Sequence, residues 1–312
     1  MSRTVALTGA TGFIGSVLAR RLHAENWMVR ALVRTSAQAE KISNIPIKPI
    51  KGDLSDLNSL RCLVEGVDAV VHCAGLVRGN SLKDFQRVNV DGLENILTAA
   101  SDLPKAPQFL LLSSLAARVP KISAYAESKF SGEQRVILNK KNIPWTILRP
   151  PAVYGPNDQD LKVIWDWMRR GIALKLGPAN ARFSLLYVDD LADAVIACLK
   201  TASKSLGVLE LHDGYSGGYT WDNVIDVVGR LSQRHIQRIQ LSKGMLSWIA
   251  LCNVTISSLV GALPVLTTGK VRELWHDDWV CDNADISNLT GWYPKVVLDE
   301  GLRRTFKIES VT

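Results

Sequence analysis

A glycine-rich segment near the amino terminus constrains the fold of this chain more than any other feature. An apolar run at residues 5–7 predicts a short buried strand, and apolar residues at helical spacing over 14–22 predict a helix. Gly9, Gly12 and Gly15 lie between them and overlap the helix start. In such a turn the first glycine allows the tight bend, the second lets backbone approach a pyrophosphate, and the third lets helix pack on strand. The order therefore predicts a dinucleotide site, with phosphate at the helix N-terminus.

Composition limits the class of protein. The chain has 312 residues, of which 47% are hydrophobic, enough for a sizeable core. The net charge of +7 suits an anionic cofactor or substrate, but Lys and Arg form no run longer than a pair, which argues against a nucleic-acid partner. The five Cys include no Cys-x-x-Cys and the five His lack ligand spacing. These patterns indicate reduced thiols, a cytoplasmic location and no metal site.

Further short apolar runs predict the other strands of a parallel sheet covered on both faces. These runs are 28–33, 45–50, 67–72, 109–112 and 145–149. Helical patterns separate them, so the sequence predicts an α/β fold with a Rossmann-type doubly wound parallel sheet. No repeat or low-complexity linker divides the chain, so a smaller C-terminal substrate lobe must be interleaved with the sheet. We expect a dinucleotide-binding domain at 1–155, to which 184–211 returns, and a substrate-binding lobe from 156–183 and 212–312.

The second predicted strand carries the signal for the cofactor. It ends at Arg34, where an acidic residue would hold the ribose 2′-OH of NAD and an Arg would accommodate the 2′-phosphate of NADP. Arg34 therefore favours NADP, helped by Ser36 or Lys41, with NAD as the alternative if Arg34 is only a solvated strand end. The strand at 67–72 ends in small residues that let a cofactor approach: Cys73, Ala74 and Gly75.

Several motifs resemble the extended branch of the short-chain dehydrogenase/reductase superfamily, which includes epimerases, dehydratases, 3β-hydroxysteroid dehydrogenases and dihydroflavonol reductases. They are TGATGFIG at 8–15, RPPAVYGP at 149–156 and VDDLA at 188–192, and the likeness extends over nearly the whole chain. In the family, Asp53 and Leu54 would lie against the adenine and Asn89 would bond the cofactor or active site, unless its role is structural. The remaining cofactor contacts that the resemblance implies are Gly9, Thr11, Gly12, Phe13, Ile14, Gly15, Pro150 and Val153.

A Tyr and a Lys four residues apart are the predicted catalytic pair. On a helix, Tyr125 and Lys129 share a face and can point into one cleft. Tyr-x-x-x-Lys alone is weak evidence, but this pair follows Ser113-Ser114 at a strand end, which matches the superfamily's Ser, Tyr and Lys set. The resemblance implies Ser114, in preference to Ser113, as the third member. A free phenol with a pKa near 10 needs a nearby cation to act as a proton shuttle at neutral pH, and Lys129 would supply it and also hold the ribose.

Three functions remain open. The first, which the resemblance to 3β-hydroxysteroid dehydrogenases and dihydroflavonol reductases implies, is hydride transfer between NADP(H) and a secondary alcohol or ketone. Seven of nine Trp lie beyond Gly155, which favours an apolar small molecule as its substrate. The second is a nucleotide-sugar epimerase or dehydratase. Sugar dehydratases of the family carry acidic residues directly after the active-site hydroxyl residue, whereas residues 115–117 here are apolar, and epimerases carry an Arg where this chain has Phe183. Both differences weaken the second function. The third is a non-catalytic dinucleotide-binding regulator, against which the intact Ser, Tyr and Lys set argues.

The stretch from Gly244 to Gly269 contains no charged residue. Polar residues and Pro264 interrupt it within the length that a membrane span requires, which argues against a span. Peripheral membrane contact and a buried or substrate-covering helix are the alternatives. The family resemblance also implies a homodimer.

Overall fold

The computed structural model describes residues 3–139, 143–201, 204–259, 264 and 266–308. The chain divides into two compact units, which we describe separately. Unit 1 comprises Met1–Arg149, Ala192–Glu210 and Ala284–Trp292, and unit 2 comprises Pro150–Leu191, Leu211–Asn283 and Tyr293–Thr312.

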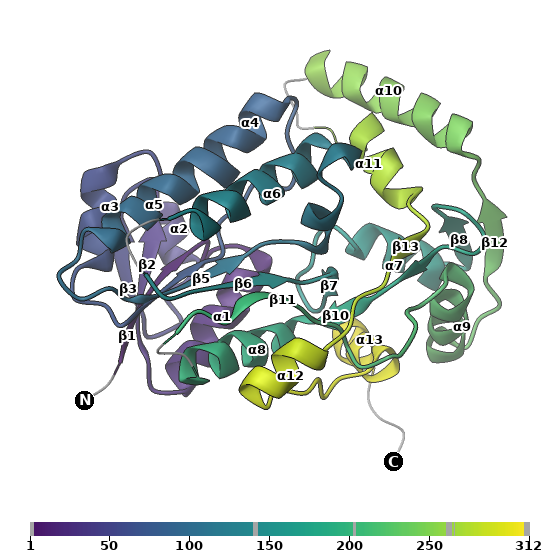
Figure 1. Cartoon of the computed structure of the whole chain (residues 1–312). Helices are drawn as coiled ribbons and strands as arrows, with labels where there is room; N and C mark the ends of the chain where they lie inside the picture. The colour runs from purple at the N-terminus through teal and green to yellow at the C-terminus, as the bar shows by residue number, and fades with distance from the viewer. Residues whose placement is uncertain (1–2, 140–142, 202–203, 260–263, 265, 309–312) are drawn as a thin grey trace. The chain divides into compact units, whose positions relative to one another are not determined.

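Unit 1 is built on a seven-stranded parallel sheet in the order β11-β6-β5-β4-β1-β2-β3 (Figure 1). The strands are β1 (Thr4–Thr8), β2 (Met28–Val33), β3 (Lys48–Lys51), β4 (Ala69–His72), β5 (Gln108–Leu112), β6 (Trp145–Arg149) and β11 (Gly207–Glu210). Val5 pairs with Val29 on one side and with Ala69 on the other. The chain therefore runs outward from β1 through β2 and β3 and then crosses back to β4. Open α/β sheets bind ligands at the position where the strand order reverses, outside the carboxyl ends of the strands.

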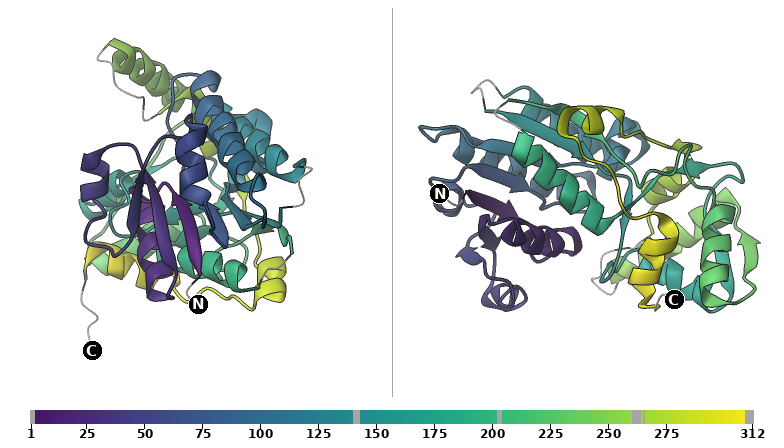
Figure 2. Two further views of the ribbon diagram at one scale, coloured as in Figure 1. Left: turned by 90° about the vertical axis from the view of Figure 1, so that its left-hand side faces the viewer. Right: turned by 90° about the horizontal axis from the view of Figure 1, so that it is seen from below.

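Helices lie on both faces of this sheet, as Figures 1 and 2 show. Leu60, Ile96 and Val136 come from three helices and pack with sheet residues such as Phe109 and Ile147 in one buried cluster. The other face holds Leu18 and Leu22, both fully buried. The helices of unit 1 are α1 (Phe13–Ala24), α2 (Ser36–Glu40), α3 (Leu57–Val64), α4 (Leu82–Gln86), α5 (Gly92–Ser101), α6 (Ala124–Ile137), α12 (Ala284–Thr290) and most of α8 (Val188–Thr201). The doubly wound parallel sheet predicted from the sequence is confirmed.

Local differences from the sequence prediction have structural causes. The helix that we expected over 85–100 begins at Leu82 and contains a π-helical segment at Arg87–Asp91 between α4 and α5. We expected residues 212–312 in the substrate lobe, but Ala284–Trp292 belongs to unit 1, where α12 contacts β11. The first boundary falls after Arg149, instead of after residue 155. Of the segment 184–211 that we expected in the dinucleotide-binding domain, residues 184–191 belong to unit 2 and Ala192–Glu210 to unit 1.

The described part of unit 2 contains three small parallel strand pairs and several helices. The pairs are β7 (Ala152–Tyr154) with β10 (Leu185–Tyr187), β8 (Ile172–Lys175) with β12 (Gln237–Gln240), and β9 (Arg182–Phe183) with β13 (Asp278–Trp279). The helices are α7 (Lys162–Arg169), α9 (Trp221–Ser232), α10 (Lys243–Leu259), α11 (Thr268–Leu274) and α13 (Leu298–Phe306). Its main core is aromatic: Tyr154 packs edge-on against Trp165 and Tyr187. We expected a Trp-rich substrate lobe, and in unit 2 some of these aromatic residues, such as Trp165, form its hydrophobic core.

Candidate dinucleotide and catalytic site

The glycine turn after β1 has no room for a side chain at Gly9 or at Gly15. Gly9 has φ +76°, and a Cβ there would lie 2.8 Å from the Ala74 nitrogen. A Cβ at Gly15 would lie 2.0 Å from the Gly9 carbonyl oxygen. The Gly12 N–H donates a hydrogen bond of 3.0 Å to that same oxygen, which closes the turn. Only glycine at 9 and 15 therefore permits this turn against the end of β4.

The helix after the turn begins without a side-chain cap. Helix α1 begins at Phe13, and its N-cap residue Gly12 offers no side-chain cap. The first turn carries no acidic residue. Backbone N–H groups at an uncapped helix start are unsatisfied by side chains and carry partial positive charge, which favours an anion such as pyrophosphate.

A buried His joins the ends of β1 and β4. The Thr8 hydroxyl lies 3.0 Å from His72 Nδ1 and accepts a hydrogen bond of 3.1 Å from the Ala74 N–H. Burial, with a smaller contribution from the Lys129 charge, lowers the pKa of His72 to about 3, so the ring is neutral. Burial also raises the pKa of the Cys73 thiol to about 12. These groups hold the small residues after β4 in position and do not titrate near neutrality.

Two arginines approach Asp53 in unit 1. Hydrogen bonds from Ser55 chiefly hold the Asp53 pKa below its usual value, and the positive charges of Arg34 and Arg87 add to this effect. Both arginines are exposed, and neither forms an ion pair within the part of the chain that the structure describes. Arg87 was missed by sequence reasoning, because only the fold brings it near Asp53. The pair could accept the additional phosphate of NADP.

Leu54 and Asn89 mainly make contacts within the protein. Asn95 donates a hydrogen bond of 2.9 Å to the Leu54 carbonyl. The Asn89 amide donates to the Leu76 carbonyl at 3.0 Å and to the Ser128 hydroxyl at 2.9 Å, and its oxygen accepts from the Leu76 N–H at 2.7 Å. Asn89 lies in the π-helical segment, a feature frequent at functional sites. These bonds favour the structural alternative, in which Asn89 fixes the loop after β4 to α6.

The two serines after β5 differ in their surroundings. Ser113 is buried and donates its hydroxyl to Glu133. Ser114 is half-buried, and its hydroxyl oxygen accepts a hydrogen bond of 3.2 Å from the Ala116 N–H. The Ser114 hydroxyl hydrogen can therefore still be donated to a substrate oxygen. This difference supports the choice of Ser114.

Helix α6 positions the predicted catalytic pair. Ser123 caps the helix by accepting a hydrogen bond of 3.0 Å from the Ala126 N–H, and Tyr125 follows in the first turn. The Tyr125 ring is half-buried and packs edge-on against Phe85, with ring centroids 6.1 Å apart. Lys129 lies one turn further along the same helix. The cap holds the first turn of α6 and therefore the position of Tyr125 on the helical face that it shares with Lys129.

Lys129 is the best-defined group of the site. Its side-chain nitrogen donates a hydrogen bond of 2.8 Å to the Leu112 carbonyl oxygen at the end of β5. A Cβ at Gly75 would lie 3.7 Å from the same nitrogen. Burial lowers the Lys129 pKa to about 8, against the opposing effects of Cys73 and Glu133. The structure thus brings Lys129 to the carboxyl ends of β4 and β5, beside the residues expected to admit a cofactor.

A buried ion pair supports this end of the sheet and was missed by sequence reasoning. Glu133 is fully buried, and both its oxygens accept hydrogen bonds from Arg149, at 3.0 and 2.6 Å. Arg149 also lies 3.7 Å from Glu210. The available signal was the position of Glu133 four residues after Lys129, on the same helical face. This pair connects α6 to the ends of β6 and β11.

Pro150 and Val153 belong to unit 2, whereas every other predicted site residue belongs to unit 1. Val153 lies in β7 and pairs with Leu186 of β10. Among the described residues, no group of three or more His, Cys, Asp and Glu could hold a metal ion. No helix in the described part of the chain has the length and apolar character needed to cross a membrane.

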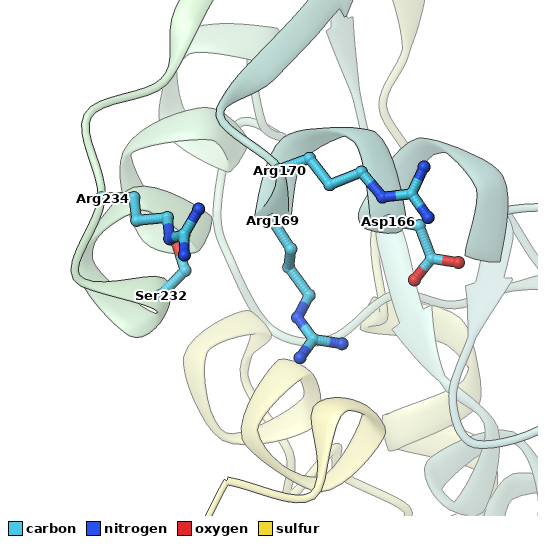
Figure 3. A pocket seen from close by; sticks show the side chains of 5 residues that line it. All are labelled: Asp166, Arg169, Arg170, Ser232 and Arg234. Carbon is cyan, nitrogen blue, oxygen red and sulfur yellow. The ribbon is translucent and has the colours of Figure 1, made fainter.

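Unit 2 has a surface hollow of about 530 Å³. It is lined by Asp166, Arg169, Arg170, Ser232 and Arg234. Figure 3 shows the guanidinium groups of Arg169 and Arg170 pointing in different directions, so they do not converge on one ligand atom. The Arg169 guanidinium lies over the Phe306 ring, 5.1 Å from its centroid. The hollow shares no residue with the predicted site.

Comparisons with known proteins identify the family. Residues 5–208 match the NAD dependent epimerase/dehydratase family. A ceramide reductase from Caulobacter vibrioides is 35% identical over 286 residues, covering 91% of this chain and 87% of that protein. A 4-hydroxy-2-methyl-3-oxo-4-farnesyl-3,4-dihydroquinoline-1-oxide ketoreductase from Stigmatella aurantiaca is 29% identical over 170 residues, covering 49% of this chain and 51% of that protein.

Solved structures share the fold. The UDP-glucuronic acid 4-epimerase from Bacillus cereus, in complex with UDP-glucuronic acid and NAD, superimposes with a TM-score of 0.75 at 20% identity. The match covers 97% of this chain and 98% of that one. At this identity the likeness concerns the fold and leaves the substrate open.

Proposed function

Because the chain belongs to the NAD dependent epimerase/dehydratase family, and is thus an NAD(P)-dependent enzyme of the extended short-chain dehydrogenase/reductase type, we propose that it transfers hydride between NADP(H) and a secondary alcohol or ketone. The observation that carries this proposal is the placement of Lys129. A buried ammonium held by the Leu112 carbonyl, next to Gly75 and one turn from Tyr125, is suited to a Tyr–Lys proton-transfer pair.

The residues of unit 1 fit NADP. The side-chain-free turn at Gly9 and Gly15 and the uncapped start of α1 would hold the pyrophosphate. Arg34 directly follows β2, and Arg87 begins the π-helical segment. Both are exposed cations near Asp53 and would hold the 2′-phosphate. Lys129 would hold the ribose. NADP, when bound, supplies or accepts the hydride, which is chemistry that protein side chains do not provide.

The chain's own residues would manage the proton and the substrate oxygen. In the reductive direction, the Tyr125 hydroxyl donates its proton to the carbonyl oxygen as that oxygen becomes an alcohol. Ser114 donates a hydrogen bond to the same oxygen and so orients the substrate. The Lys129 ammonium favours the phenolate that remains on Tyr125. In the oxidative direction each step is reversed.

We propose an apolar ketone or alcohol as the substrate. The two reductase relatives are named for ceramide and for a farnesyl-bearing quinoline. The Trp-rich second half of the chain is consistent with an apolar ligand. A homodimer is a further proposal that rests on the family resemblance alone.

A nucleotide-sugar epimerase is the second candidate, favoured by the shared fold with the Bacillus cereus enzyme. One turnover screen separates the two. NADPH oxidation, followed by absorbance, would be measured with long-chain ketones, steroids, flavonoid-type ketones, small aldehydes and nucleotide sugars, and the nucleotide sugars would also be analysed for epimerised product. We expect turnover with an apolar ketone and none with Tyr125→Phe. Epimerisation of a nucleotide sugar without net NADPH consumption would contradict the proposal.

A further inference from the structure

Helix α10 exposes an apolar surface that the proposed reaction does not use. We propose that this surface docks the protein onto an anionic lipid bilayer, with α10 lying in the plane of the headgroups. The proposal depends on α10 and its neighbour α11 and is independent of the proposed reaction.

One side of α10 is occupied by the protein. Leu246 and Ala250 are buried and cluster with Val271 of α11, together with Leu266 and Trp275. Ser257, at the same helical spacing, is also buried. Figures 1 and 2 show α10 at the periphery of unit 2, with α11 packed beside it.

Most of the exposed side chains on the remaining circumference of α10 are apolar, with Thr255 as a polar exception. Trp248 is 68% exposed, Ile256 60% and Leu251 57%. Met245, Ile249 and Val254 are also exposed. At 100° per residue, Trp248 and Leu251 lie about 160° and about 140° round the helix from Leu246, and Met245 and Ile256 adjoin Trp248 on the same exposed side. An exposed apolar strip of this kind marks an interaction surface, because a free surface would leave it in contact with water.

The geometry fits a helix that lies on a bilayer better than one that crosses it. Helix α10 has 17 residues, which at 1.5 Å per residue is about 25 Å, and one side of it is already packed. Trp248 lies opposite the packed side of α10 and suits the membrane–water interface, where Trp side chains are enriched. In-plane helices bury their apolar side among the headgroups and upper acyl chains.

The charges around α10 favour an anionic surface over a second copy of the chain. No acidic residue occurs between Lys243, at the start of α10, and Glu273. Glu273 is buried and pairs with Lys270 at 2.9 Å. Lys243, Lys270 and Arg272 are exposed, so exposed cations flank the uncharged stretch in the sequence. Two copies meeting through α10 would bring like charges together, whereas anionic headgroups would complement them.

The test is sedimentation of the full chain with sucrose-loaded vesicles, of pure phosphatidylcholine or with about one third phosphatidylglycerol. We expect binding to the anionic vesicles that weakens with added salt. The double variant Trp248→Ser/Ile256→Ser should lose at least tenfold in vesicle affinity, and Lys243→Glu/Lys270→Glu should lose binding to anionic vesicles specifically. Trp167→Ser, at an exposed Trp on α7, is the matched control and should bind as the native protein does.

Two further measurements complete the test. NADPH titration and thermal melting establish that each variant is folded, and light scattering gives the oligomeric state. Absence of native binding to anionic vesicles overturns the proposal, as does equal binding by the α10 variants. A native dimer that Trp248→Ser/Ile256→Ser converts to monomer, with no vesicle binding, would assign the strip to a second copy instead. Failure of every ketone in the turnover screen would leave vesicle binding unaffected, so the two proposals fail separately.

Discussion

The Lys129 side-chain nitrogen donates a 2.8 Å hydrogen bond to the Leu112 carbonyl oxygen, so the last residue of β5 holds the cation of the proposed site. A carbonyl at the end of a parallel strand is an available acceptor, because the ladder of hydrogen bonds stops there. The contact orients the ammonium through a neutral acceptor. Its charge is therefore available to the neighbouring phenol.

The pH dependence of turnover should report Lys129. Burial lowers its pKa from 10.5 to about 8, so the folded protein loses this positive charge as pH rises through about 8. We expect kcat/KM for ketone reduction to fall about tenfold per pH unit above that value. The stability of the fold should change in the opposite direction. Between pH values of about 8 and 10.5 the Lys129 side chain binds more protons in the unfolded chain than in the folded protein, so the free energy of unfolding rises with pH in this range. A profile that stays flat to pH 10 would contradict the assignment.

Replacing Tyr125 with Phe should separate chemistry from cofactor binding. The variant keeps the ring that packs against Phe85 but loses the proton that the substrate oxygen needs. We expect kcat to fall by about 10²–10⁴-fold with the Kd for NADPH nearly unchanged. Stopped-flow turnover and fluorescence titration measure the two quantities. Retention of activity by Tyr125→Phe would remove this residue from the mechanism.

Cofactor preference should depend on Arg34 and Arg87. Losing one charge-assisted contact to a 2′-phosphate costs about 1.5–3 kcal/mol, or about 10–100-fold in affinity. Arg34→Ala should weaken NADPH binding by that factor and leave NADH binding unchanged, because NADH lacks the phosphate. Arg87→Ala should act in the same direction. Isothermal titration with both nucleotides checks this, and equal native affinities for NADPH and NADH would refute NADP specificity.

Breaking the Glu133–Arg149 pair should destabilise unit 1. Glu133→Gln replaces the buried carboxylate by a neutral amide, so the Arg149 guanidinium loses its charged partner. We expect the free energy of unfolding to fall by about 2–3 kcal/mol. Glu127→Gln, at an exposed position on the same helix, is the control and should change stability by less than about 0.5 kcal/mol. Denaturant titration compares them. Similar losses in both variants would mean that the buried pair has no special role.

The glycine turn should tolerate no methyl group at Gly15. Gly15→Ala places a Cβ 2.0 Å from the Gly9 carbonyl, so the turn must open at a cost of about 1–3 kcal/mol. NADPH affinity should fall at least about tenfold as the phosphate site deforms. Gly244→Ala has open space around its Cβ and serves as the control. If Gly15→Ala bound NADPH normally, the pyrophosphate could not lie at this turn.

Sequence alone determined what depends on local order. The strand, glycine turn and helix at residues 4–24 follow from neighbouring residues, because periodicity and glycine spacing act over a few positions. The placement of Tyr125 and Lys129 on one helix follows for the same reason. The parallel sheet was predictable because its strands are short apolar runs between helical patterns.

Tertiary structure decided what depends on distant residues. The proximity of Arg87 to Asp53, the burial of Glu133 with Arg149 and the packing of α12 on β11 each join segments that are separated in sequence. The sequence also did not determine that the apolar residues of α10 are exposed, because the same apolar stretch could pack in a core or face outward. Local pattern shows that a side chain is apolar or charged, whereas only the fold determines which partner removes it from water.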